Sequence, residues 1–158
     1  GSAVTVVKDV CTGAGNDQVF NSEEGVLYFE GSALVNDSDT KRICISDGSS
    51  LNRIVLTFAN NTITYAYISG GVSANIIYNS DTTINKKYAF TWKLNEFKFW
   101  ANGVQVGIDT SGGVMPLNTL DEFDLTDASG YSPFYGNIKE LQVFTTALTD
   151  AELIALTT

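Results

Sequence analysis

Residues 86–106 read KKYAFTWKLNEFKFWANGVQV and give the clearest indication of strand structure in the chain. Large apolar side chains alternate with smaller ones over residues 88–92, a short polar break follows, and the alternation resumes at Phe97. Alternation on both sides of a short break predicts a β-hairpin with one apolar face. Asn102-Gly103 tolerates the positive φ angles of a tight turn, so a third strand is expected to begin at Val104.

The same alternation sorts the side chains of this hairpin between two faces. The set expected to face the core is Tyr88, Phe90, Trp92, Phe97, Phe99 and Ala101. Trp100 falls on the opposite, polar face, which it shares with Glu96 and Lys98. An indole on a polar face is costly in hydration terms unless something covers it. A sugar ring, a neighbouring loop or a subunit contact could each be that cover.

Length and charge restrict the class of protein. The chain has 158 residues, which suits one domain with a sizeable core. Gly1-Ser2 is interpreted as a cloning remnant, and residues 3–158 as a single domain. Charged residues make up 17% of the chain, the formal net charge is −9, and histidine is absent. This charge balance argues against nucleic acid and membranes as partners, and no apolar run approaches the roughly 20 residues that span a bilayer.

Short alternating segments separated by turn residues continue along most of the chain. The expected strands cover residues 3–10, 25–34, 41–46, 53–58, 62–69, 73–78, 88–92, 97–101, 104–106, 120–125 and 136–144. This spacing predicts an all-β fold, with two antiparallel sheets packed as a sandwich or jelly roll. The period changes at residues 148–156, where Thr149 and Glu152 have the spacing of a capping box. One short C-terminal helix is therefore expected.

The two cysteines leave two interpretations open. Cys11 and Cys44 could form one disulfide in an oxidising compartment. Cys44 also lies between Ile43 and Ile45 in a strand-like run, where a free thiol is equally ordinary.

The end of the chain resembles a known family. Residues 134–144 read FYGNIKELQVF and residues 147–153 read ALTDAEL. Together they resemble the closing signature of laminin-G-like, concanavalin A-like jelly rolls. Residues 25–30 (GVLYFE) and 99–106 (FWANGVQV) are similar to two further positions of that family. The resemblance implies a concanavalin A-like jelly-roll sandwich for this chain.

The resemblance also bears on location and role. The most similar domains, which share the run SDGSSLNR at residues 46–53, occur in tail-associated proteins of bacteriophages and in bacterial secreted proteins. An extracellular or virion-associated location is therefore implied, with either glycan recognition or a structural role in a fibre. Fold alone does not decide between these two functions.

The sequence argues against catalysis. Without histidine there is no Ser-His-Asp or Cys-His arrangement. Residues 122–127 (EFDLTD) resemble the Glu-x-Asp-x-x-Glu strand of laminarinase-type glycoside hydrolases, and alternation places Glu122 and Asp124 on one face. The position of the acid/base Glu in that motif holds Asp127, whose side chain is one methylene shorter. A non-catalytic domain is expected, and glycoside hydrolysis ranks third among the functions considered.

Oxygen-rich turns leave open whether the chain holds a structural calcium ion. Such turns occur at residues 36–39, at Asp47, and at Asp124 with Asp127, and related jelly rolls often hold calcium with such groups. The same residue types dominate ordinary turns because they hydrogen-bond to their own backbone. No loop has the ligand spacing of an EF-hand, and no other cofactor is predicted.

Aromatic side chains are the remaining functional feature, because the C–H faces of sugar rings stack on Trp and Tyr. Tyr131 and Tyr135 lie in or beside loop 128–133, where an exposed tyrosine is more often functional than in a strand. The sequence therefore predicts a non-catalytic carbohydrate-binding module. It would recognise a polysaccharide or cell-surface glycan through Trp100, Lys98, Tyr131 and Tyr135. The alternative is a structural or oligomerising domain of a phage tail fibre that binds no sugar.

Overall fold

A computed structural model describes residues 11–158, and the strand predicted at residues 3–10 lies outside them. The elements are β1 (Gly25–Ala33), β2 (Lys41–Ser46), β3 (Asn52–Ala59), β4 (Thr62–Ser69), β5 (Val72–Asn79), β6 (Lys86–Trp92), β7 (Phe97–Ala101), β8 (Val104–Asp109), β9 (Glu122–Asp124), β10 (Gly136–Phe144) and α1 (Asp150–Thr157). One five-stranded sheet has the order β10-β1-β6-β7-β8, and the other has the order β5-β4-β3-β2-β9.

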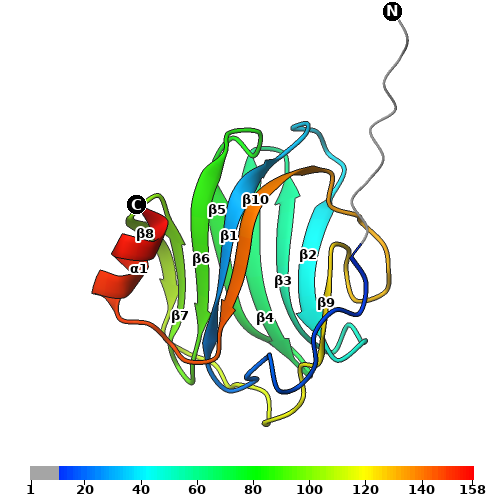
Figure 1. Ribbon diagram of the computed structural model, residues 1–158, viewed down its shortest axis with the longest axis vertical. Helices are drawn as coiled ribbons and strands as arrows, with labels where there is room; N and C mark the ends of the chain where they lie inside the picture. The colour runs from blue at the N-terminus through cyan, green and yellow to red at the C-terminus, as the bar shows by residue number, and fades with distance from the viewer. Residues whose placement is uncertain (1–10) are drawn as a thin grey trace, which may run out of the picture.

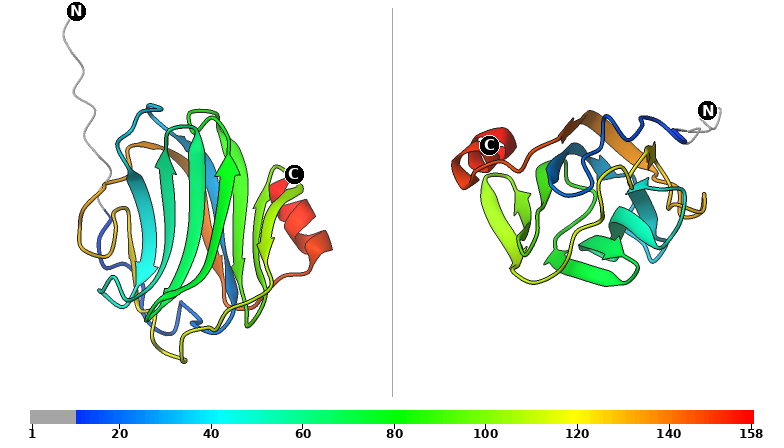
Figure 2. Two further views of the ribbon diagram at one scale, coloured as in Figure 1. Left: turned by 180° about the vertical axis from the view of Figure 1, so that it is seen from behind. Right: turned by 90° about the horizontal axis from the view of Figure 1, so that it is seen from below.

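The two sheets stack face to face, and α1 lies on the outer side of the first sheet (Figures 1 and 2). Neighbouring strands pair antiparallel throughout both sheets. The predicted antiparallel jelly-roll sandwich with one short C-terminal helix is confirmed. Within residues 11–158, no helix is long and apolar enough to cross a membrane.

Two hairpins follow directly from their turn residues. Asn102 and Gly103 join β7 to β8 with φ angles of 47° and 77°. Asn60 and Asn61 join β3 to β4 with φ angles of 47° and 57°. Two successive positive φ angles define the type I′ turn, whose twist matches that of the strands it connects. The asparagine and glycine residues at these positions therefore fix the register of both pairs.

β9 is shorter than predicted because its expected start is diverted. The backbone N–H groups of Thr119 and Leu120 both donate to Ser22 Oγ, at 3.1 and 2.9 Å. Leu120 is fully buried in the core instead of extending the strand. Ser22 lies far away in sequence, so the local pattern could not reveal this contact.

The core fills the space between the sheets and is unusually aromatic. Phe90 and Phe99 face each other across β6 and β7, with ring centroids 4.6 Å apart. Tyr65 and Tyr67 are buried in the same core, and each hydroxyl has a partner. Tyr65 donates to the Thr91 carbonyl oxygen at 2.7 Å, and Tyr67 accepts from the Met115 backbone N–H at 2.8 Å. These hydrogen bonds offset the cost of burying the two hydroxyls.

β1 lies between β10 and β6, and glycine makes its pairing with β10 possible. A side chain at Gly136 would collide with the Ser32 carbonyl oxygen, and one at Gly31 would collide with the Asn137 carbonyl oxygen. The register slips between Glu30 and Gly31, where the pairing is irregular. The closing strand therefore depends on glycine for the close approach of its backbone.

Trp100 lies on the outer face of the first sheet, as the alternation predicts, but it is not exposed. Only 5% of its surface is accessible, and it packs with Val26, Ala89 and Leu153 in a second apolar cluster. Leu153 belongs to α1, so the helix supplies the cover that the indole needs. The expected exposure of Trp100 is corrected: its ring face is occupied by the protein itself.

Lys98 helps to fix α1 in place. Its Nζ lies 3.2 Å from Glu96 and 2.7 Å from Asp150 at the start of the helix, and 12% of its side chain is exposed. The helix begins with the predicted capping box. The Thr149 hydroxyl accepts from the Glu152 backbone N–H, and the Glu152 carboxylate accepts from the Thr149 backbone N–H. Lys98 is therefore an anchor of the helix, and not a free group on an open face.

Phenylalanine in place of each tryptophan should separate their two environments. Trp92 Nε1 donates to the Asn21 carbonyl oxygen at 2.9 Å, whereas Trp100 Nε1 is buried without a hydrogen-bond partner in the described part of the chain. Both substitutions remove the same volume. Trp92→Phe also leaves the Asn21 carbonyl oxygen without this hydrogen bond. It should therefore lower the free energy of unfolding by about 1–2 kcal/mol more than Trp100→Phe does. Urea unfolding of both variants measures this difference, and equal losses would contradict it.

Trp100→Ala should be far more damaging than Trp100→Phe. Loss of a buried indole between the sheet and α1 should cost about 3–5 kcal/mol, the range for large-to-small changes in a core. Urea unfolding and the helical signal in circular dichroism measure the effect. A loss under about 1 kcal/mol, the level of a surface change, would show that α1 does not pack on Trp100.

Candidate functional site

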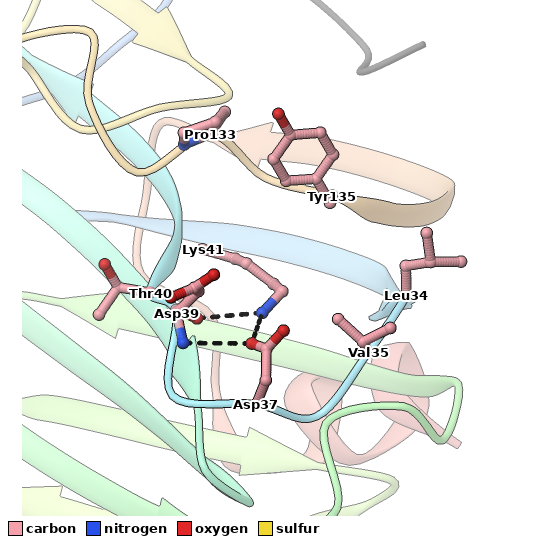
Figure 3. Close-up of a pocket in the computed structure, with 8 residues that line it drawn as sticks. All are labelled: Leu34, Val35, Asp37, Asp39, Thr40, Lys41, Pro133 and Tyr135. Carbon is pink, nitrogen blue, oxygen red and sulfur yellow. Dashed lines mark hydrogen bonds and ion pairs between the residues drawn. The ribbon is translucent and has the colours of Figure 1, made fainter. Parts of the chain in front are cut away.

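A pocket lies where the end of β1 meets the start of β10. Its volume is about 400 Å³, and Figure 3 shows the side chains that line it: Leu34, Val35, Asp37, Asp39, Thr40, Lys41, Pro133 and Tyr135. Five of them belong to the segment that joins β1 to β2, Lys41 begins β2, and the other two precede β10. The pairing of Ala33 with Gly136 brings these distant segments together.

Hydrogen bonds hold the two walls of the pocket against each other. The Leu34 backbone N–H donates to the Tyr135 carbonyl oxygen at 2.9 Å. The Arg42 backbone N–H donates to the Ser132 carbonyl oxygen at 2.9 Å, and the hydroxyls of Thr40 and Ser132 lie 2.9 Å apart. The pocket is therefore built on backbone pairing that continues the sheets, and its walls are fixed before any ligand arrives.

Lys41 forms the polar floor of the pocket. Its side chain is only 4% exposed. The ammonium donates to Asp37 Oδ1 at 2.5 Å and to the Asp39 carbonyl oxygen at 3.0 Å, as the dashed lines in Figure 3 mark. The hydrogen bond from Lys41 holds the pKa of the Asp37 carboxyl below its ordinary value. Asp37 and Lys41 therefore remain an ion pair at neutral pH.

The rim of the pocket is apolar. Leu34, Val35 and Tyr135 are 50%, 47% and 40% exposed. In Figure 3 the Tyr135 ring and Asp37 lie on opposite sides of the Lys41 ammonium. An aromatic face opposite a floor of charged and hydroxyl groups can hold a ligand that has both an apolar face and polar edges.

Tyr131 lies in the loop that leads to this pocket, and Asp127 shapes that loop. Asp127 accepts from the backbone N–H groups of Ser129 and Tyr131, at 2.9 Å each, and from Arg42 Nη1 at 3.0 Å. Burial would raise the pKa of Asp127, but these hydrogen bonds and the Arg42 charge outweigh it and lower the pKa. Tyr131 is left 73% exposed beside the pocket without lining it.

The four sequence-predicted site residues fall into two groups. Tyr131 and Tyr135 lie together before β10, whereas Trp100 and Lys98 lie on β7. β1 and β6 separate β7 from β10 in the sheet, which spaces the two groups by about 14 Å or more. Alternation correctly identified which face Trp100 occupies, but it could not place the two groups relative to one another.

The carboxylates of the hydrolase-like segment have structural partners. Glu122 and Asp124 lie opposite Ser46 and Cys44 on the outer face of the second sheet. Asp124 is 4% exposed and accepts from the Gly13 backbone N–H at 2.8 Å. Burial, followed by the nearby negative charge of Asp124, raises the pKa of Glu122. Of the two expected partners, Asp124 is bound to the backbone and Asp127 shapes a loop.

Two arginines on the outer face of the second sheet were not singled out from the sequence. Arg42 and Arg53 alternate with the core residues Ile43 and Ile54 and so point outward. Arg42 is paired with Asp127, but Arg53 Nε is buried without a hydrogen-bond partner among the described residues. The sequence could have identified both arginines, because they are basic residues at outward positions of two paired strands.

The oxygen-rich turns and the cysteines also have local roles. Asp47 accepts from the Ser49 backbone at 2.9 Å and from Asn52 Nδ2 at 2.8 Å. In the described part of the chain, no cluster of three or more Asp, Glu, His or Cys side chains is arranged to hold a metal ion. Cys11 and Cys44 are free thiols, and burial raises the pKa of Cys44 to about 12.

The fold is shared with modules of sialidases. The Ruminococcus gnavus IT-sialidase CBM40 bound to α2,3 sialyllactose has a TM-score of 0.74 and 16% identity over 96% of both chains. The same module bound to α2,6 sialyllactose has a TM-score of 0.74 and 17% identity over 96% of both chains. A leech intramolecular trans-sialidase complexed with 2,7-anhydro-Neu5Ac has a TM-score of 0.71 and 15% identity, over 96% of this chain and 26% of the enzyme. At this level of identity the likeness establishes a common fold.

The sequence itself carries the family relationship. No curated protein sequence matches this chain. Residues 33–154 match the family described as the concanavalin A-like lectin/glucanases superfamily. The matched range runs from the end of β1 into α1 and includes the closing strand and the capped start of the helix. The chain therefore belongs to the concanavalin A-like lectin/glucanase superfamily.

Proposed function

We propose that this chain is a non-catalytic carbohydrate-binding module that holds a polysaccharide or cell-surface glycan in the pocket beside Tyr135. The observation that carries the proposal is an exposed tyrosine ring facing a buried, ion-paired lysine across a pocket with fixed walls. A pyranose ring matches this arrangement, because its C–H face stacks on an aromatic ring while its hydroxyls bind polar groups. Tyr131 extends the surface for a longer chain of sugars.

The size of the pocket suits a small part of a glycan. A volume of about 400 Å³ lies at the lower end of the range for small-molecule sites. One or two sugar rings would occupy it, and further rings would extend along the loop that carries Tyr131. Trp100 and Lys98 do not belong to this proposal, since α1 covers the one and ion pairs hold the other.

The structural neighbours support a binding role. The R. gnavus module has nearly the same extent as this chain and is described in complex with sialyllactose. The leech trans-sialidase contains a domain of this fold within a much longer chain, of which this chain covers 26%. A location outside the cell follows from the proposed ligand. The alternative role in a phage tail fibre has no counterpart among these proteins.

A second candidate ligand is an acidic sugar on the outer face of the second sheet. Arg53 supports it, because its buried Nε has no partner among the described residues and a guanidinium suits a carboxylate. The neighbours in complex with sialyllactose also favour such a ligand. The two candidates use different residues, so substitutions distinguish them.

Tyr135→Ala should weaken glycan binding at least tenfold, about 1.4 kcal/mol, because it removes the aromatic side of the pocket. Tyr131→Ala should have a smaller effect, limited to long glycans. A glycan array followed by calorimetry on the best ligand measures both effects. Trp100→Phe is the matched aromatic control and should bind like the wild type.

Three outcomes would change the proposal. Binding that survives Tyr135→Ala but is lost in Arg53→Gln would move the site to the sheet face. Loss of binding in Trp100→Phe would mean that the aromatic residue that contacts the sugar is Trp100 on β7. No binding to any glycan by the folded wild type would favour a structural domain.

Asp127 should make the stability of the domain depend on pH. Its pKa is lowered in the folded state, so its contribution is complete above the unfolded value of about 3.9 and is lost as the pH falls through the folded value. At pH 7, Asp127→Asn should lower the free energy of unfolding by about 1–3 kcal/mol. Urea unfolding should show the difference between the variant and the wild type closing as the pH falls below the unfolded value.

The exposed Asp121 provides the control for this titration. Asp121→Asn should have the same free energy of unfolding as the wild type at pH 7 and at low pH. A gap between Asp127→Asn and the wild type that persists at low pH would mean that the carboxylate charge of Asp127 does not stabilise the loop.

A further inference from the structure

We infer that the Tyr135 pocket selects neutral sugars and rejects acidic ones, with Asp39 as the residue that determines this specificity. The inference rests on the proposed function of this pocket. It gives this pocket a different class of ligand from sialyllactose, the described ligand of the R. gnavus module, which ends in a carboxylate sugar.

The cation in the pocket is already neutralised. Lys41 is paired directly with Asp37 and donates a second hydrogen bond to the Asp39 carbonyl oxygen. An ammonium has three N–H donors, so one donor is left for a ligand, but no net positive charge is left with it. Removing a buried lysine from its carboxylate partner to bind an anionic ligand would leave a buried charge unpaired, which is strongly unfavourable.

Asp39 then determines the sign of the net charge in the pocket. Its side chain is exposed on the pocket wall and makes no ion pair or side-chain hydrogen bond among residues 11–158. Arg42, the next residue after Lys41, is committed to Asp127. The charged side chains that line the pocket are Asp37, Asp39 and Lys41, which leaves one uncompensated negative charge.

Sugar hydroxyls match these groups, and a carboxylate does not. A carboxylate such as Asp39 only accepts hydrogen bonds, so it binds hydroxyl donors. The free donor of Lys41 can bind a hydroxyl oxygen, and Tyr135 can stack on the ring. An acidic sugar would face Asp39 at short range and a chain of net charge −9 at longer range.

A glycan array with neutral, sialylated and uronate-containing structures tests the inference on the full chain. The wild type should retain neutral glycans, and Tyr135→Ala should lose them. Galactose oligomers and galacturonate oligomers give a matched pair that differs in the carboxylate. The neutral member should bind at least tenfold more tightly at low ionic strength, and added salt should narrow the difference.

Asp39→Asn isolates the effect of the charge, because the Asp39 side chain makes no ion pair or side-chain hydrogen bond among residues 11–158. The variant should reduce the preference for the neutral oligomer at least threefold by improving the binding of the acidic one. Asp121→Asn removes the same charge at the far end of β2, where the Asp121 backbone N–H donates to Ser46. This control should keep the wild-type preference.

The outcomes separate this inference from the proposed function. Glycans that bind in a Tyr135-dependent manner and all carry a carboxylate would overturn the inference and leave the proposed function intact. An unchanged preference in Asp39→Asn would remove Asp39 as its cause and overturn the inference. The absence of any Tyr135-dependent binding would overturn both.

Discussion

Antiparallel pairing of β1 with β10 underlies both the closed sandwich and its candidate site. It joins a strand near the start of the described chain to one near its end, and it requires glycine at Gly31 and Gly136 because carbonyl oxygens of the partner strand lie too close for a side chain. β1 is almost entirely buried: its inward side chains lie in the core, and on its outer face Val26 packs in the apolar cluster with Trp100 and Leu153 of α1. The pocket lies at the point where this pairing ends, so the same contact that closes the sandwich also builds its candidate site.

Much of the fold could be predicted because it is encoded locally. The alternation around Trp92 and Phe97, the turn at Asn102-Gly103 and the capping box at Thr149 each depend on residues a few positions apart. Period, turn chemistry and capping act over that range, so they are readable in sequence. β9 was predicted too long because its start is diverted by Ser22, a contact between distant parts of the chain.

The candidate site was only partly predictable for the same physical reason. Periodicity assigns Trp100 to a face but does not say what lies on that face, and the cover comes from Leu153 in another element. Tyr135 was singled out from the sequence as a residue beside a loop, and it lines the pocket. Asp37 was considered only as part of an oxygen-rich turn and Lys41 not at all, because they meet Tyr135 only through the pairing of two strands. A turn rich in Asp and Ser looks ordinary until the opposite wall is known.

The burial of both tryptophans determines how ligands can be observed. Trp92 lies inside the core and Trp100 beneath α1, and neither lines the Tyr135 pocket. Intrinsic indole fluorescence should therefore report whether the sandwich is intact and should be silent when the pocket fills. Tyrosine emission near the pocket would be lost among the other tyrosines of the chain. Occupancy must be followed by heat, by nuclear magnetic resonance of the Tyr135 region, or by a label on the ligand.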